Sequence, residues 1–362
     1  LGFLKDTWRD ANLPKEFETL RTLNNAGVWN VPTFICGGVV PGQITTSNKY
    51  INEDWNLGAC PSVFCIREHQ RILTEEIGQP LDYLKSSKQL TRIVYEAFLA
   101  HEDAFTLCKI LHRDVSGGNI LIVYDDKAPN DNHDGGGRGL LNDWDLAIHT
   151  DDLDKAESQG KPMISAHLTG TFGTWQFMPI GLLGNGTKIH QPQDDFESFI
   201  YVMLYYSLRY LQHSKVGPAL PNLMTYIFDY SIHRCDGTWY RGAPKLSLAC
   251  GWGVLGKDFR FECEPINRCI GGGIASIRQW RDYYESETYT LEEELKEFTF
   301  LFQRAPSTLV FCDHTVIYRS LQHHGSMKHL ASCSPSFHPS SLICITLLMC
   351  IVSSCSTVIL HM

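Results

Sequence analysis

Apolar and polar positions follow two different periods along the chain. At its start, residues 1–6 predict the end of a strand that carries Lys5, residues 8–10 a loop, and residues 15–24 a helix opened by Pro14. Short strands are expected over residues 28–36, 62–65 and 70–76. Residues 90–109 then place apolar side chains on one face of a long helix. The pattern predicts a strand-rich beginning followed by a helical part.

A second pair of strands is expected further along. Residues 120–124 form a β-branched run, residues 125–138 are rich in Asp, Asn and Gly, and an apolar run from residue 139 ends in Asp143 and Asp145. A strand, a loop and a strand with acids at both ends predict a hairpin that holds a metal ion. A strongly apolar helix is expected to begin near Asp195.

The most informative chemistry lies just before this hairpin. His112, Arg113 and Asp114 are followed five residues later by Asn119, which is the spacing of a protein-kinase catalytic loop. Such a loop carries a proton acceptor, Asp114, and a metal ligand, Asn119. The alternative is a surface turn in which an Asp caps a helix. The second motif downstream favours the catalytic interpretation.

That second motif is Asp143-Trp144-Asp145. Mg²⁺ takes hard oxygen ligands and needs only one or two protein carboxylates beside phosphate, so Asp143 with Asn119 is a sufficient set. Taken alone, two acids around a Trp would indicate a solvated turn. Their distance from His112 in the sequence favours the metal site.

Two residues near the start are candidates for holding the α- and β-phosphates of a nucleotide. Kinases use a strand Lys and a Glu on the next helix for this purpose, which suggests Lys5 and Glu16. Lys5 as an ordinary surface lysine is the alternative, and Glu18 competes with Glu16. The apolar pattern stops at residues 74–78, where a hinge with Glu76 would offer its backbone to adenine.

Later motifs extend the pattern. Residues 170–179 resemble the segment that closes a kinase activation loop, and Thr169, Thr171 and Thr174 are the hydroxyls that a phosphate-binding Arg113 would use. Asp195, at the start of the apolar helix, is expected to accept hydrogen bonds from catalytic-loop amides, or else to act as an ordinary N-cap.

Composition indicates an intracellular enzyme. The 362 residues are 43% hydrophobic and 20% charged, with a net charge of −9 and no Lys/Arg stripe, which argues against nucleic acid as a partner. Thirteen Cys without a Cys-x-x-Cys pair favour free thiols in a reducing cytoplasm or nucleus. Leu1 and the missing leader suggest a chain that is incomplete at its start.

The C-terminal stretch has a different composition. From about residue 305 Ser, His and Cys predominate, and residues 342–360 carry no charge. Such a run just reaches across a bilayer, so a membrane anchor is one interpretation. Its Ser, Thr and Cys content favours the other, a poorly ordered tail.

Four motifs occur in one order: His112-Arg113-Asp114 with Asn119, Asn142 to Ala147, Gly173 to Met178, and Asp194-Asp195 with Glu197-Ser198. Together they resemble the fungal-specific protein-kinase-like domains known as the FunK1 group. The resemblance implies an α+β bilobal protein-kinase fold, with a small β-rich lobe in residues 1–77 that lacks its first strands, a helical lobe in residues 78–304 and a tail in residues 305–362. It also implies ATP with Mg²⁺ and phosphoryl transfer to Ser or Thr of a protein substrate. Substrate identity and oligomeric state stay open.

The same comparison shows departures from the usual pattern. Ser116 replaces a Lys that contacts the γ-phosphate, Asp145 replaces a Gly, no Gly-x-Gly-x-x-Gly occurs, and no Ala-Pro-Glu follows Met178, so the Glu that braces the helical lobe is expected to be absent. His112 and Arg113 are expected to shape the loop. A pseudokinase that serves as a binding module, or a small-molecule phosphotransferase of the aminoglycoside or choline kinase kind, are the alternative functions.

Overall fold

The computed structural model describes residues 1–50, 66–124, 135–153, 173–184, 188–215, 219–233, 239–251 and 253–285. The chain packs as two units, Leu1–Ile274 and Ala275–Met362, and only residues 275–285 of the second are described. The predicted strand at residues 62–65, Thr169, Thr171 and the tail from residue 305 lie outside the described residues. The lobe boundaries at residues 77 and 304 stay predictions.

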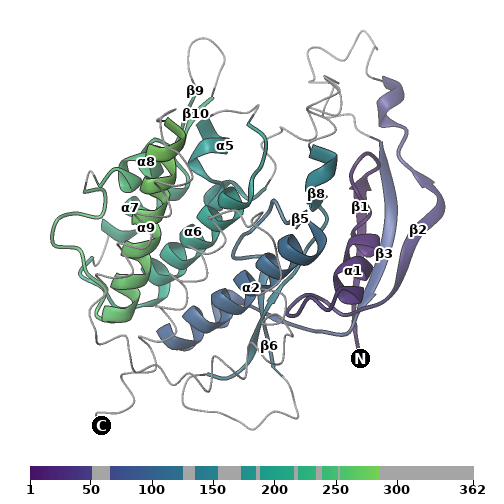
Figure 1. Cartoon of the computed structure of the whole chain (residues 1–362), viewed down its shortest axis with the longest axis horizontal. Coiled ribbons are helices and arrows are strands. Elements are labelled where there is room, and N and C mark those ends of the chain that lie inside the picture. The colour runs from purple at the N-terminus through teal and green to yellow at the C-terminus, as the bar shows by residue number, and fades with distance from the viewer. Residues whose placement is uncertain are drawn as a thin grey trace, which may run out of the picture. The chain divides into compact units, whose positions relative to one another are not determined.

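The first part of the larger unit is a three-stranded antiparallel sheet. Its strands β1 (Phe3–Asp10), β2 (Phe34–Ile44) and β3 (Arg67–Thr74) lie in the order β1-β3-β2, and α1 (Glu16–Asn25) packs beside them (Figure 1). In the register Lys5 is opposite Ile72, and Arg9 is opposite Glu68. Side chains two residues apart share a face, so Lys5 and Arg9 point to the same side of the sheet.

Two expectations for this region were wrong. Residues 8–10 continue β1 instead of forming a loop, because the buried Arg9 donates to Glu68 at 2.8 Å across the sheet. The second strand begins at Phe34 instead of residue 28, since Asn30 has a φ of 57° and Pro32 offers no N–H to a ladder. Both corrections come from tertiary pairing that a local pattern does not contain.

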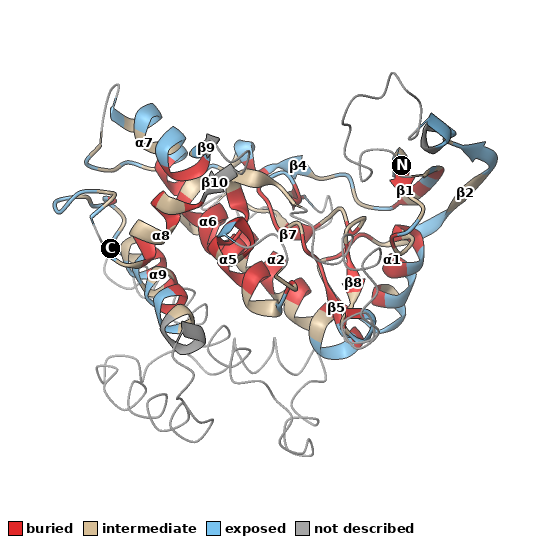
Figure 2. Cartoon of the chain, turned by 90° about the horizontal axis from the view of Figure 1, so that it is seen from above, coloured by how far each residue is buried: buried red, intermediate tan, exposed pale blue. Residues whose placement is uncertain are grey.

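Two long helices, α2 (Ser87–Cys108) and α6 (Pro192–Tyr210), form the centre of the helical part. Ser86 caps α2 by accepting a hydrogen bond from the Gln89 amide at 3.0 Å, as N-cap residues do. Phe98 of α2 meets Phe196 and Phe199 of α6 edge to face. Buried residues concentrate along both helices (Figure 2).

Two small antiparallel pairs carry the loops that matter for chemistry. β6 (Ile120–Val123) pairs with β7 (Arg138–Leu141), as predicted for the hairpin, and β5 (Ile110–Leu111) pairs with β8 (Ile148–His149). Residues 112–119 therefore run from β5 to β6, and residues 142–147 run from β7 to β8. Gly139 lets β7 lie against α2, because a Cβ there would come within 2.2 Å of the Ile93 carbonyl oxygen.

The remaining elements are short or peripheral. They are η1 (Ser47–Tyr50), β4 (Gln79–Pro80), η3 (Leu81–Tyr83), η4 (Trp175–Phe177), α5 (Ile180–Gly184), α7 (Ala219–Phe228), β9 (Ser231–His233), β10 (Trp239–Arg241), α8 (Ala243–Ala249) and α9 (Glu264–Glu285). The order of antiparallel sheets followed by helices is the predicted α+β, kinase-like fold. Within the described part of the chain, no helix is both long and apolar enough to span a membrane.

Candidate active site

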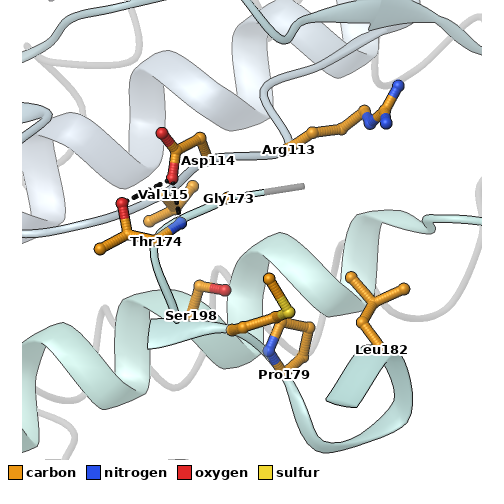
Figure 3. A pocket seen from close by; sticks show the side chains of 9 residues that line it. Arg113, Asp114, Val115, Gly173, Thr174, Pro179, Leu182 and Ser198 are labelled. Carbon is orange, nitrogen blue, oxygen red and sulfur yellow. Dashed lines mark hydrogen bonds between the residues drawn. The ribbon is translucent and has the colours of Figure 1, made fainter. Parts of the chain in front are cut away.

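Asp114 is held on both of its carboxylate oxygens. Asn119 Nδ2 donates to Asp114 Oδ2 at 3.0 Å and to its carbonyl oxygen at 2.8 Å. On the other side Thr174 donates to Oδ1 from its amide at 2.7 Å and from its hydroxyl at 2.9 Å (Figure 3). The carboxylate thus has a fixed orientation and retains lone pairs for a further donor.

Burial makes Asp114 a stronger base than an exposed carboxylate. It raises the pKa of Asp114, and the nearby Asp143 acts in the same direction, while the two Thr174 donors oppose the rise. The contribution of Asp143 also shows that the two carboxylates lie within electrostatic reach. A carboxylate with a raised pKa is better suited to accept a proton from a hydroxyl.

His112 connects the catalytic loop to the acidic turn. Its Nε2 lies 3.0 Å from the Asn142 carbonyl oxygen, and its Nδ1 lies 3.3 Å from the Asp114 amide. An amide can only donate, so we assign the neutral tautomer protonated on Nε2. Complete burial lowers the pKa of His112, which agrees with this assignment. Its ring also meets Trp144 edge to face at 4.6 Å between centroids.

Arg113 and Asp143 both have left-handed backbones, with φ of 71° and 64°. Non-glycine residues rarely adopt this conformation, and where they do it is a frequent feature of functional sites. The Arg113 side chain is 3% exposed and extends away from Asp114 (Figure 3). Asp145, which replaces a Gly, is not among the described residues with a positive φ, whereas Asp143 is.

Asp195 fastens the catalytic loop to α6. Its carboxylate accepts from the amides of His112 and Arg113 at 3.1 Å each, and it contacts His101 Nε2 at 2.7 Å and His190 Nε2 at 2.8 Å. Burial alone would raise its pKa, but His190 and His101 outweigh that effect and hold the pKa well below the usual range. The predicted contacts with the loop amides are present, and the two His contacts were not foreseen.

Lys5 joins the sheet to the acidic turn. Its Nζ lies 2.6 Å from Glu16 Oε2 and 2.7 Å from Asp143 Oδ1. Burial acts against the charged ammonium, yet Glu16 and Asp143 raise the pKa of Lys5. The same ammonium lowers the pKa of Asp143 against the effect of burial. The structure therefore brings together Lys5, Glu16 and Asp143, which the sequence analysis had selected from separate segments. The competing Glu18 contacts Lys15 instead of Lys5.

Side chains from the sheet and α1 contact all three residues of the acidic turn. Lys5 binds Asp143, Glu16 Oε1 accepts from the Trp144 amide at 3.0 Å, and Gln70 Nε2 donates to Asp145 Oδ1 at 3.2 Å. Burial raises the pKa of Glu16 to about 7, with Lys5 opposing and the other carboxylates contributing. The turn thus gathers more negative than positive charge.

Glu76 lies in the expected connection between β3 and β4, but its side chain is used elsewhere. Oε2 accepts from the Thr33 amide at 2.7 Å, and Oε1 contacts the Thr33 hydroxyl at 2.7 Å and Arg138 Nη2 at 3.1 Å. Because both carboxylate oxygens of Glu76 are engaged in these hydrogen bonds, only its backbone could contact a nucleotide.

A small pocket lies beside Asp114. It is lined by Arg113, Asp114, Val115, Gly173, Thr174, Met178, Pro179, Leu182 and Ser198 (Figure 3). Gly173, at a φ of 112°, allows the close approach, because a Cβ there would lie 3.0 Å from the Arg113 carbonyl oxygen. Sequence reasoning treated Thr174 as a phosphorylation candidate and missed its contact with Asp114. No Glu follows Met178 in this segment, and Glu197 and Lys245 instead contact its backbone.

Asn119 and Asp143 carry oxygen atoms of the kind that could hold a divalent cation. Asn119 directs its nitrogen to Asp114, and no described residue donates to its Oδ1. Asp143 Oδ1 contacts Lys5, its carboxylate also accepts from the Asp145 amide, and its side chain is 38% exposed. An amide oxygen and an ionised carboxylate are ligands that Mg²⁺ accepts.

Comparisons with known protein families and structures identify the family of this chain. A search of curated proteins gave no match. Among solved structures, the kinase PK-1 of the Cydia pomonella granulovirus is 13% identical, with 75% of this chain and 77% of that chain covered and a TM-score of 0.43. The family described as fungal protein kinase matches residues 2–207, more than half of the chain. The chain belongs to the fungal protein kinase family.

Proposed function

We propose that this protein transfers the γ-phosphoryl group of ATP, with Mg²⁺, to Ser or Thr hydroxyls of a protein substrate. The supporting observation is the convergence of two groups on adjoining loops. Asp114 is oriented by Asn119, and Asp143 is bound by Lys5. The loops are joined directly, since the Asn142 amide donates to the Asn119 carbonyl oxygen at 2.8 Å.

The residues present fit Mg-ATP. Asp143 and Asn119 would hold Mg²⁺, Lys5 would contact the α- and β-phosphates, and the backbone near Glu76 would face adenine. Three carboxylates, Glu16, Asp143 and Asp145, surround the single ammonium of Lys5 and provide the negative charge that a cation neutralises. When bound, Mg²⁺ stabilises the charge on the phosphate oxygens.

Asp114 accepts the proton of the attacking hydroxyl in this proposal. Thr174 and Asn119 fix the carboxylate from two sides, so it need not reorganise when a hydroxyl binds. Burial supports this role through the raised pKa of Asp114. His112, Arg113 and Asp195 keep the loop in place without contacting the reacting atoms.

A polypeptide substrate is supported by the pocket beside Asp114. The pocket is only large enough for a water molecule, and Val115, Met178, Pro179 and Leu182 form its wall beside the place where the acceptor hydroxyl would bind. Ser or Thr as acceptor is the class that the family resemblance implies. A peptide that places a hydroxyl at Asp114 would cover this pocket.

The test compares the full 362-residue chain with Asp114→Asn and with the exposed control Asp258→Asn. Labelled ATP is supplied with a generic basic protein and, separately, with free amino-alcohols, and phosphoamino acids are identified. We expect labelled Ser or Thr, retained in Asp258→Asn and reduced about 10²–10⁴-fold in Asp114→Asn, the usual range for loss of a general base. Labelled alcohols with unlabelled protein, or full activity of Asp114→Asn, would overturn the proposal.

A further inference from the structure

In residues 178–180, the Ile180 amide and the Met178 carbonyl oxygen find their hydrogen-bond partners in side chains from other helices. Ile180 begins α5, so its amide has no partner within the helix, and Pro179 before it has no N–H. Each group meets a buried charged side chain. Glu197 Oε1 accepts from the Ile180 amide at 2.8 Å, and Lys245 Nζ donates to the Met178 carbonyl oxygen at 2.7 Å.

The two charged side chains are connected through Tyr201. Its hydroxyl donates to Glu197 Oε1 at 2.7 Å, and the Lys245 ammonium lies 4.4 Å from the centroid of its ring. Lys245 is 1% exposed and Glu197 is 7% exposed. Burial lowers the pKa of Lys245 to about 7, although Glu197 and Asp229 oppose this effect.

Burying an ammonium is costly, and a well-packed apolar residue would often be at least as stable. What this lysine adds is a directed bond to one carbonyl. That carbonyl belongs to Met178, which lines the pocket beside Asp114 together with Pro179 and Leu182. Lys245 also lies in α8, beyond residues 2–207 that the family match covers.

We propose that Lys245 and Glu197 form a clamp that positions residues 178–182 for binding the polypeptide substrate next to Asp114. The inference rests on the proposed function and makes Lys245 a positioning residue. The clamp acts on substrate binding because Met178 and Pro179 line the pocket, whereas Lys5, Asn119 and Asp143 lie outside it. Loosening the clamp therefore affects the polypeptide more than ATP.

The experiment uses the full chain with Lys245→Met, which keeps the length of the side chain and removes its donor, and the exposed Lys257→Met as matched control. Steady-state KM is measured for ATP and for a peptide that the wild-type chain phosphorylates. Losing a hydrogen bond from a charged donor predicts a rise in peptide KM of about tenfold or more. The KM for ATP is expected to stay within about twofold, since neither Lys245 nor Glu197 contacts Lys5, Glu16 or Asp143.

A second readout does not require catalysis. Amide hydrogen exchange over residues 177–183 is expected to accelerate in Lys245→Met, while exchange in α2 stays as in wild type. If Lys245→Met does not fold, Tyr201→Phe removes the hydroxyl that donates to Glu197 and should change both readouts in the same direction. Unchanged peptide KM and unchanged exchange in an active enzyme would overturn the clamp. A wild-type chain that phosphorylates no peptide would instead overturn the proposed function, and exchange alone would then decide on the clamp.

Discussion

The ammonium of Lys5 lies 2.7 Å from Asp143 Oδ1, although 138 residues separate the two in sequence. This contact joins β1 of the sheet to the turn between β7 and β8, and the same ammonium also binds Glu16. Asp143 has a left-handed backbone, so the turn needs tertiary contacts to keep its shape. Lys5 therefore organises the turn and also faces the proposed phosphate site.

Lys5→Met is expected to weaken nucleotide binding. The substitution leaves Glu16 and Asp143 without their cation and removes a donor for phosphate, so we expect the KM for ATP to rise by about tenfold or more. Titration of Mg-ATP in a steady-state assay measures this, with Lys257→Met as the surface control. An unchanged KM for ATP would argue against a role of Lys5 in the nucleotide site.

Thr174→Ala is expected to lower kcat, because Asp114 Oδ1 loses the hydroxyl donor at 2.9 Å and keeps only the Thr174 amide. A hydrogen bond to a charged group contributes about 1.5–3 kcal/mol, which corresponds to a decrease of roughly tenfold to a hundredfold. Thr174→Ser retains the hydroxyl and serves as the matched control. If both variants have the wild-type kcat, the hydroxyl does not orient the base.

Local motifs predicted the loop of residues 112–119 and the acidic turn of residues 142–147, and both lie between short paired strands. Asp114 and Asn119 lie in contact because five residues of one tight loop separate them, and a short loop leaves few arrangements. Glu16, selected as the Glu on the helix after Lys5, is buried at the start of α1 together with Leu20 and Leu23. Proximity along the chain made these features accessible to sequence reasoning.

Local sequence patterns do not predict contacts between elements that are distant in the sequence. Gln70 binds Asp145 across 75 residues, and Lys245 binds Met178 across 67. Nothing in the neighbouring sequence distinguishes Lys245 from a surface lysine, because its burial depends on how α8 meets α6. The same reason explains why Arg9 was placed in a loop, since its burial depends on Glu68 in another strand.

Asp195→Asn is expected to destabilise the fold in a pH-dependent way. The pKa of Asp195 is held well below its model-compound value of 3.8, so its contribution to stability is present above pH 3.8 and is lost as pH falls toward the lower native pKa. At pH 6–7 breaking this buried network should cost about 3–5 kcal/mol. Urea unfolding from pH 7 to pH 2.5 measures the difference from wild type, with Asp258→Asn as control. A difference that stays constant over the whole range would contradict the ionised state of Asp195.

Lys245 is expected to show a dependence of the same sign at higher pH, because burial lowers its pKa from 10.5 to about 7. Below pH 7 the native and unfolded chains both hold this proton, so Lys245 adds no slope to the free energy of unfolding. Above pH 7 the unfolded chain still binds the proton and the native chain releases it, so stability rises with pH relative to Lys245→Met. Glu197 and Tyr201 of α6 and Asp229 after α7 face the ammonium.

The measurement is the difference in Tm between wild type and Lys245→Met from pH 6 to pH 9, a range in which ordinary tyrosines stay protonated. We expect a constant difference up to about pH 7 and then a steady shift in favour of wild type. Lys257→Met, at an exposed lysine, serves as the matched control. A flat difference for Lys245→Met would show that the buried amine keeps an ordinary pKa, and the clamp would then act with its full charge at every physiological pH.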